Sequence, residues 1–358
     1  MATSNLQNIV RQHILSLAPY SSARDEYTGK EGIFLDANEN PLGSVTPENW
    51  NRYPDPYQLE IKEKIAPLKG CRPSQIFLGN GSDEPIDLII RLTCEPREDN
   101  IIILPPTYGM YEVSANVNNV EIQKIPLTLD YQLDTEKIIS SINPKTKLIF
   151  ICSPNNPTGN LIDRKAIIEI VENFQQGIVI IDEAYNDFSD EPSFIPELDK
   201  FQNVMVLQTF SKAWGLAALR LGMAFGNEEL IKLLNKIKYP YNINGLTQRA
   251  LLENISNVDF MKDSVKILNQ NRKILISELE KLQIVTKIFP SDANFLLVKF
   301  TEAKNIFDYL ISQKVIVRDR SKVFLCDDSL RISVGSEEEN YTLLHLLKQY
   351  KPLKITIT

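Results

Sequence analysis

The sequence predicts an α/β protein, with a large domain built on a mostly parallel central sheet flanked by helices and a smaller α+β domain after it. Between about residues 75 and 226, short continuous apolar runs alternate with helical stretches, which indicates parallel strands covered by helices on both faces. Past residue 250 the pattern changes to one long amphipathic stretch followed by short strands and helices. The 358 residues are enough for two such domains.

The apolar runs are the expected strands of the large domain, at residues 75–78, 100–104, 147–152, 178–181, 204–207 and 219–225. Helices are expected between them. Residues 163–174 carry apolar side chains on one face, and another helix begins at Ser82 or Asp83, with Pro85 in its first turn.

Apolar residues spaced by three, four and seven between Met261 and Leu282 predict one long helix at the start of the small domain. The remaining expected elements are strands at 294–300, 315–318 and 330–334 and helices at 302–313 and 336–350. We therefore divide the chain into three parts. They are a helical N-terminal arm that packs on a partner subunit or on the small domain (1–30), a large domain (31–250) and a small domain (251–358).

Composition excludes several classes of protein. The 39 basic and 46 acidic side chains leave a net charge of −7, which argues against a nucleic-acid binder. No apolar run approaches the ~18 residues that a membrane span needs, and no signal peptide is recognisable, so we expect a cytoplasmic protein without a membrane partner. The four cysteines form no C-x-x-C pair and the chain has only two histidines, so we expect neither a metal site nor a histidine-based triad.

Polar loops follow four of the predicted strands. They are residues 79–83 (Gly-Asn-Gly-Ser-Asp), 153–159 (Ser-Pro-Asn-Asn-Pro-Thr-Gly), 182–185 (Asp-Glu-Ala-Tyr) and 208–222, which contain Lys212 and Arg220. Each loop alone is compatible with an ordinary turn, a helix cap or a solvated lysine. Because ligands of parallel sheets bind beyond the carboxyl ends of the strands, we expect all four loops to face one crevice.

These motifs resemble those of the pyridoxal-phosphate (PLP) dependent aminotransferases of fold type I, and most of all the histidinol-phosphate aminotransferase family. Further segments carry the resemblance over almost the whole chain, at residues 19–24, 36–41, 52–55, 106–111 and 330–335. Trp214 and Ala218 depart from the phenylalanine and glycine that related members often carry, and we interpret both as packing variation.

The resemblance implies a role for each side chain around the cofactor ring. Lys212 condenses with the cofactor aldehyde and then moves the proton of the substrate, which requires a neutral amine and hence a lowered pKa. Asp182 pairs with the pyridine nitrogen and keeps it protonated. Tyr185 and Asn156 hydrogen-bond the 3′-oxygen of the ring, with Asn155 as the competing asparagine, and Tyr108 stacks on the ring face.

The resemblance also implies the groups that hold the cofactor phosphate. Arg220 supplies a guanidinium fork, Thr209 and Ser211 supply hydroxyls, and Gly81, Ser82 and Asp83 supply backbone N–H groups at a helix start. Tyr53 resembles a tyrosine that reaches the phosphate from the partner subunit, so a homodimer with shared active sites is expected.

At the substrate end, Arg331 resembles the arginine that holds a substrate carboxylate in aminotransferases generally. In the histidinol-phosphate aminotransferase family this arginine holds the substrate phosphate with a second at the position of Arg318, and Tyr20 and Asn38 are further candidates for substrate contact. The alternative for Arg318 is a solvated strand end. Two arginines can hold a phosphate dianion or a dicarboxylate alike, so the same pocket can also take glutamate.

The expected reaction is therefore amino transfer between histidinol phosphate and 2-oxoglutarate in histidine biosynthesis, by a ping-pong sequence in which the cofactor carries the amino group. The alternatives are an aromatic amino acid aminotransferase and a PLP-dependent lyase resembling threonine-phosphate decarboxylase. A catalytically silent PLP-fold domain is disfavoured because Lys212 and Asp182 are both present. The absence of the full glycine fingerprint disfavours a nicotinamide dehydrogenase.

Overall fold

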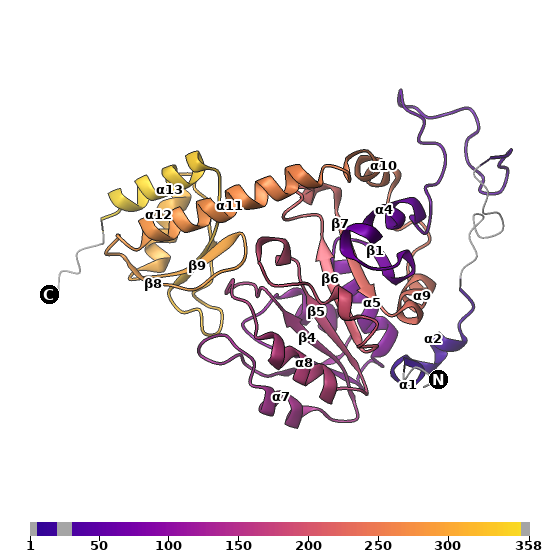
Figure 1. Ribbon diagram of the computed structural model, residues 1–358, viewed down its shortest axis with the longest axis horizontal. Helices are drawn as coiled ribbons and strands as arrows, with labels where there is room; N and C mark the ends of the chain where they lie inside the picture. Colours follow the sequence, from indigo (N-terminus) through magenta and orange to yellow (C-terminus); the bar gives the residue numbers. More distant parts are fainter. Residues whose placement is uncertain (1–5, 20–30, 352–358) are drawn as a thin grey trace.

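The alternating pattern of the first two thirds of the chain forms one twisted sheet with helices on both faces (Figure 1). The computed structural model describes residues 6–19 and 31–351. Its larger sheet has the strand order β1-β7-β6-β5-β4-β2-β3. The strands are β1 (Ile76–Asn80), β2 (Asn100–Ile103), β3 (Glu121–Lys124), β4 (Thr146–Cys152), β5 (Ile178–Asp182), β6 (Val204–Thr209) and β7 (Leu221–Gly226).

Most neighbouring strands of this sheet pair in parallel, which confirms the predicted sheet type. The pairs β2–β3, β2–β4, β4–β5 and β5–β6 are parallel, whereas β7 is antiparallel to both β6 and β1. The strand β3 has no counterpart among the predicted runs, because its residues Glu-Ile-Gln-Lys form a partly exposed edge strand without an apolar run.

The helices and turns of the large domain join these strands. They are α4 (Leu59–Lys69), α5 (Asp83–Thr93), α6 (Met110–Val117), α7 (Thr135–Ser141), α8 (Arg164–Asn173), α9 (Glu228–Ile237) and α10 (Gly245–Asn254), with short 3₁₀ turns η1 (Pro73–Gln75), η2 (Asn186–Phe188), η3 (Ile195–Glu197) and η4 (Ala217–Leu219). As predicted, α5 begins at Asp83 with Ser82 as its N-cap. Asp163 caps α8 by accepting a hydrogen bond from the backbone N–H of Lys165.

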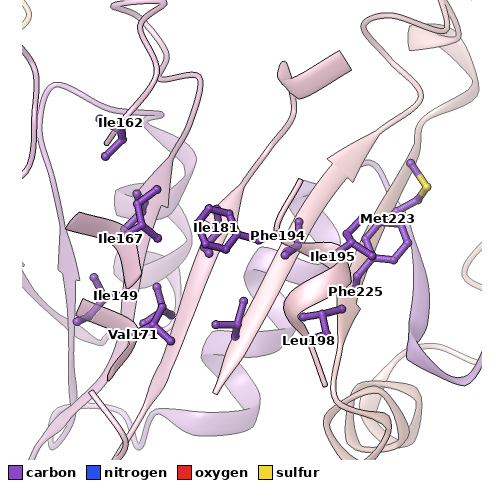
Figure 2. Packing of buried hydrophobic residues seen from close by; sticks show 14 of the residues in the cluster. Ile149, Ile162, Ile167, Val171, Ile181, Phe194, Ile195, Leu198, Met223 and Phe225 are labelled. Carbon is purple, nitrogen blue, oxygen red and sulfur yellow. The ribbon is translucent and has the colours of Figure 1, made fainter. Parts of the chain in front are cut away.

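The continuous apolar runs are explained by two hydrophobic clusters, one on each face of the sheet. Along β4, Ile149 and Ile151 belong to one cluster, and Leu148 and Phe150 belong to the other. Successive side chains of a strand point to opposite faces, so a strand covered on both faces must be apolar at every position. Figure 2 shows the first cluster, where side chains of the sheet meet those of α8 and of the segment around η3.

The small domain follows the long helix α11 (Val258–Leu279), close to its predicted position. The other elements are β8 (Val285–Ile288), β9 (Phe295–Phe300), α12 (Ala303–Ser312), β10 (Arg318–Asp319), β11 (Ser329–Ser333) and α13 (Glu337–Gln349). Its antiparallel sheet has the order β10-β11-β9-β8 and shares a separate core with α11, α12 and α13. The strand predicted at 315–318 is shorter and later, at Arg318–Asp319.

The N-terminal arm begins on the large domain of its own chain, whereas the sequence led us to expect packing on a partner subunit or on the small domain. The short helices α1 (Leu6–Ile9) and α2 (Gln12–Ser16) bury apolar side chains in the cluster that contains α5 and α9. Arg11 anchors them through a salt bridge to Glu95 at 2.8 Å. The reason is the helical apolar stripe, which finds a matching apolar surface beside α5.

In the described residues, no helix combines the length and apolar character that a membrane crossing requires.

Candidate active site

The predicted loops meet at one edge of the large sheet. Because β1 and β4–β6 run parallel, their carboxyl ends lie at this edge, and the antiparallel β7 begins there, directly after Arg220. A cavity opens at the edge and contains eleven predicted residues in its lining: Gly81, Ser82, Asp83, Tyr108, Asn156, Asp182, Tyr185, Thr209, Ser211, Lys212 and Arg220. Cys152, Ala184 and Ala217 complete the lining.

Asp182 is the buried anion of the cavity. Only 3% of its surface is exposed, and burial raises the pKa of its carboxyl. Two hydrogen bonds oppose this effect: the Tyr111 hydroxyl donates to Oδ2 at 2.5 Å, and the Ala184 backbone N–H donates to Oδ1 at 3.1 Å. The carboxylate is therefore held at the end of β5 in a fixed orientation, ready to accept from a cationic group in the cavity.

Lys212 and Tyr185 face each other across the cavity. The Lys212 Nζ lies 5.5 Å from the centroid of the Tyr185 ring. The Lys212 residue as a whole is exposed, but protein atoms surround its ammonium group. This burial lowers the pKa of Lys212; the charge of Arg331 lowers it further, and the charge of Asp182 opposes the shift. A lowered pKa increases the fraction of neutral amine, which is the nucleophilic form. Burial raises the pKa of Tyr185, so its phenol stays protonated.

The two candidate asparagines have different surroundings. Asn155 is enclosed by protein: its Nδ2 donates to the Pro106 carbonyl at 2.8 Å and to the Thr158 hydroxyl at 2.7 Å, and its Oδ1 accepts from Thr107 at 3.2 Å. Asn156 lines the cavity, where its Nδ2 lies 3.4 Å from the Tyr185 hydroxyl. Asn156, and not Asn155, is therefore placed to contact a ligand.

One end of the cavity combines a helix start with a guanidinium. The backbone N–H of Gly81 donates to the Arg220 carbonyl at 2.7 Å, and Arg220 itself adopts a left-handed φ of 53° that turns its side chain toward this loop. Gly81 has a left-handed φ of 74°, which favours glycine, and a Cβ added there would lie 2.5 Å from the Arg220 Nη2, so the guanidinium would have to move. The start of α5 and the Arg220 fork together suit an anion.

Other groups at this end adjust its charge and shape. Asp83 accepts from the Tyr108 hydroxyl at 3.0 Å and lies 3.6 Å from the Arg220 Nη2, so its carboxylate partly balances the guanidinium. The Thr209 and Ser211 hydroxyl oxygens lie 3.0 Å apart at the end of β6. Both hydroxyls can turn toward an anion, and the Tyr108 ring forms a side wall.

The small domain extends the site with Arg331. Its Nη1 donates to the Asn156 Oδ1 at 2.6 Å, and its guanidinium lies 5.3 Å from the centroid of the Phe295 ring. Arg318 is its neighbour across the β10–β11 ladder, but the Arg318 side chain is exposed and does not line the cavity.

Tyr53 and Asn38, two further predicted residues, do not join the cavity of their own chain. Tyr53 is 51% exposed and stacks on Tyr241 with the ring centroids 4.4 Å apart. Asn38 is exposed on the extended segment that precedes α4. Tyr20 falls outside the described residues.

Sequence reasoning missed the hydroxyl of Tyr111, although the residue belongs to the quoted segment 106–111. The sequence feature that could have indicated it is the spacing of three residues between Tyr108 and Tyr111 before an amphipathic stretch. In a helical turn, this spacing places both side chains on the same side. Nothing in the sequence indicates that Tyr111 lies beneath β5. That contact depends on how α6 packs on the sheet, where Tyr111 also stacks on Phe150 with centroids 4.7 Å apart.

Within residues 6–19 and 31–351, no group of three His, Cys, Asp or Glu side chains is arranged to hold a metal ion.

The donor set fits a planar phosphorylated pyridine. Asp182 lies where a ring nitrogen would be met, Tyr108 forms a wall for the ring face, and Lys212 lies within reach of an aldehyde. The anion end formed by the start of α5 and Arg220 suits the phosphate.

The fold and this cavity define a PLP-dependent enzyme of fold type I. The chain belongs to the aminotransferase class I and II family, whose model matches residues 30–347.

Comparison with known proteins narrows the family further. The chain is 54% identical to the histidinol-phosphate aminotransferase of Cytophaga hutchinsonii and 51% identical to that of Bacteroides thetaiotaomicron, with 97% of this chain and 99% of each relative covered. Among solved structures, the histidinol-phosphate aminotransferase of Clostridium acetobutylicum is similar with a TM-score of 0.77 at 26% identity, over 84% of this chain and 90% of that one.

The hydrogen bond from Tyr111 to Asp182 predicts the effect of Tyr111→Phe. Because the hydroxyl stabilises the ionised carboxylate, its loss raises the pKa of Asp182 further, and the acidic limb of the pH profile of kcat/KM moves to higher pH. A bond to a charged group contributes ~1.5–3 kcal/mol, so kcat is expected to fall by about tenfold or more. Tyr131→Phe is the matched control, because it removes a hydroxyl bond to the Leu325 carbonyl outside the cavity. An unshifted acidic limb in Tyr111→Phe would contradict the assignment.

The two asparagines predict opposite phenotypes. Asn155→Ala leaves buried partners unsatisfied, so urea unfolding of the variant should show a loss of about 2–4 kcal/mol. Asn156→Ala should change stability by less than about 1 kcal/mol and act mainly on substrate KM. Equal losses of stability in the two variants would show that this distinction is mistaken.

Proposed function

We propose that this chain transfers the amino group of histidinol phosphate to 2-oxoglutarate in histidine biosynthesis. The proposal depends mainly on a contact between the two domains. The Arg331 Nη1 donates to the Asn156 Oδ1 at 2.6 Å, beside the cavity that contains Lys212 and Asp182. The names of the relatives at 54% and 51% identity support the same substrate. A cytoplasmic location stays a prediction of the sequence.

Bound PLP supplies an electron sink for the bond broken at the substrate carbon. The side chains of the protein would orient the cofactor and move the proton of the substrate. Asp182 would accept a hydrogen bond from the ring nitrogen, and the hydrogen bonds from Tyr111 and the Ala184 N–H favour its ionised form against the effect of burial. Lys212, whose lowered pKa favours the neutral amine, would take the proton from the substrate α-carbon and return it to the C4′ carbon of the cofactor. Tyr185 and Asn156, whose hydroxyl and Nδ2 lie 3.4 Å apart at the cavity, would hydrogen-bond the ring oxygen.

The cofactor phosphate belongs at the other end of the cavity in this proposal. The N–H groups of Ser82 and Asp83 at the start of α5, the Arg220 fork and the Thr209 and Ser211 hydroxyls give it a full set of donors. Arg331 and Arg318 of the small domain would then bind the substrate phosphate. None of the described carboxylates forms a salt bridge with either arginine, so both charges are available to an anion.

An amino-donor screen tests this function. With PLP-loaded enzyme, the change in cofactor absorbance is followed after addition of histidinol phosphate, phenylalanine, tyrosine or threonine phosphate. Histidinol phosphate should give kcat/KM at least about a hundredfold above the two aromatic amino acids, because two arginines can pair with its phosphate. Threonine phosphate should yield no carbon dioxide. Preference for an aromatic amino acid, or release of carbon dioxide from threonine phosphate, would replace the proposal by the corresponding alternative. Lys212→Ala is the inactive control.

We further propose that the enzyme is a homodimer with shared active sites. The segment before α4 exposes a series of large apolar side chains and projects from the large domain (Figure 1). They include Ile33 at 91%, Leu35 at 85%, Leu42 at 94% and Val45, fully exposed. Such a group of apolar side chains is typical of an interface. In a dimer, Tyr53 from the end of this segment would meet the cofactor phosphate of the partner, and Tyr20 the substrate.

Leu42→Asp places a charge in the proposed interface. Because burial of an unpaired carboxylate is costly, sedimentation at micromolar concentration should show a shift from dimer to monomer and an accompanying loss of cofactor affinity. Leu129→Asp is the matched control, since Leu129 is 84% exposed on a turn outside the segment. The proposal fails if the wild-type protein sediments as a monomer.

A further inference from the structure

The sheet of the small domain carries a third arginine on the same face as Arg318 and Arg331. The antiparallel register sets Arg318 opposite Arg331, and the Arg320 backbone N–H continues the ladder by donating to the Ser329 carbonyl at 2.9 Å. Side chains two residues apart on a strand share a face, so Arg320 lies diagonally across from Arg331.

Arg320 is less exposed than Arg318. Its side chain is half-buried, as is that of Arg331, whereas Arg318 is exposed. Burial, followed by the charges of Arg331 and Arg318, lowers the pKa of Arg320, and its charge in turn opposes the rise in the pKa of Tyr185. Arg320 and Arg331 are thus the two guanidinium groups of this sheet that act on the cavity tyrosine.

The guanidinium of Arg320 lacks the partners that a buried cation normally has. Its Nε is buried without a hydrogen-bond acceptor among the described residues, and the neighbouring Ser321 hydroxyl is buried without a partner as well. The adjacent carboxylate of Asp319 is turned away, accepting from the Ser321 backbone N–H at 2.8 Å. A buried donor left unsatisfied in the protein is available to an acceptor oxygen of a ligand.

We propose that Arg320 is a specificity-determining residue that selects phosphorylated amino donors by adding a further guanidinium to those of Arg331 and Arg318. The inference rests on the proposed function. A phosphate monoester presents three strong acceptor oxygens and a charge of about −1.5 to −2 at neutral pH, whereas a carboxylate presents two oxygens and one charge. Arg331 alone satisfies a carboxylate through its fork, and the additional donors of Arg320 find acceptors only on a phosphate.

The test compares histidinol phosphate with histidinol, which differ only in the phosphate. In the PLP-loaded enzyme, kcat/KM is measured for both donors and for glutamate. Arg320→Gln should lower the ratio of histidinol phosphate to histidinol by about tenfold to a hundredfold, because a charged hydrogen bond is lost, and should change glutamate by less than about threefold. Arg320→Lys, which keeps the charge without the fork, should lose an intermediate amount. Lys322→Gln removes a charge from an exposed neighbour on the same loop and should leave the ratio unchanged.

The inference is overturned if the ratio in Arg320→Gln stays within about twofold of wild type, or if histidinol and histidinol phosphate lose activity equally, as a structural role would require. A thermal unfolding curve that matches wild type verifies that the variants fold. Failure of the proposed function is a separate result: the wild-type enzyme itself would then not use histidinol phosphate. In that case the same ratio is measured with threonine phosphate and threonine.

Discussion

A carboxylate with almost no contact with water, Asp182, is the group around which the large domain is organised. Burial of an ionised carboxyl is costly unless hydrogen bonds compensate for lost hydration. The fold supplies them from two directions, with Tyr111 of α6 from below the sheet and the Ala184 N–H from the loop that follows β5. The next residue, Glu183, is buried too and is held by Ser193 and the N–H of Phe194. This pair of anchored acids fixes the loop that carries Tyr185.

The substrate end of the site belongs to neither domain alone. Arg331 comes from the small sheet and Asn156 from the large one, and their hydrogen bond lies beside the edge-to-face contact of Tyr185 with Phe295, whose centroids are 5.0 Å apart. An apolar cluster under these contacts joins the two domains, with side chains of α11 packed against it. The orientation of the small domain therefore determines where Arg331 lies relative to the cavity that contains Lys212 and Asp182.

Cationic charge is distributed unevenly along the cavity. At the start of α5, Arg220 is partly balanced by Asp83 at 3.6 Å. On the small sheet, Arg318 and Arg331 have no described carboxylate as a salt-bridge partner, and the charge of Arg331, after burial, lowers the pKa of Lys212. Like charge destabilises an ionised group, so Arg331 and Arg220, after burial, both favour the neutral form of the Lys212 amine.

The sequence by itself determined the α/β class, most strands of the large sheet, the start of α5 and eleven residues of the cavity lining. These features depend on local patterns: continuous apolar runs mark strands covered on both faces, and motif residues follow directly from the strand ends. The tertiary structure alone decided which asparagine faces the cavity, that Tyr111 supports Asp182, that the N-terminal helices pack beside α5, and that Arg320 is less exposed than Arg318. Each of these depends on contacts between segments far apart in the chain, and such contacts are set by the packing of helices and sheets, which leaves no periodic signal in the sequence.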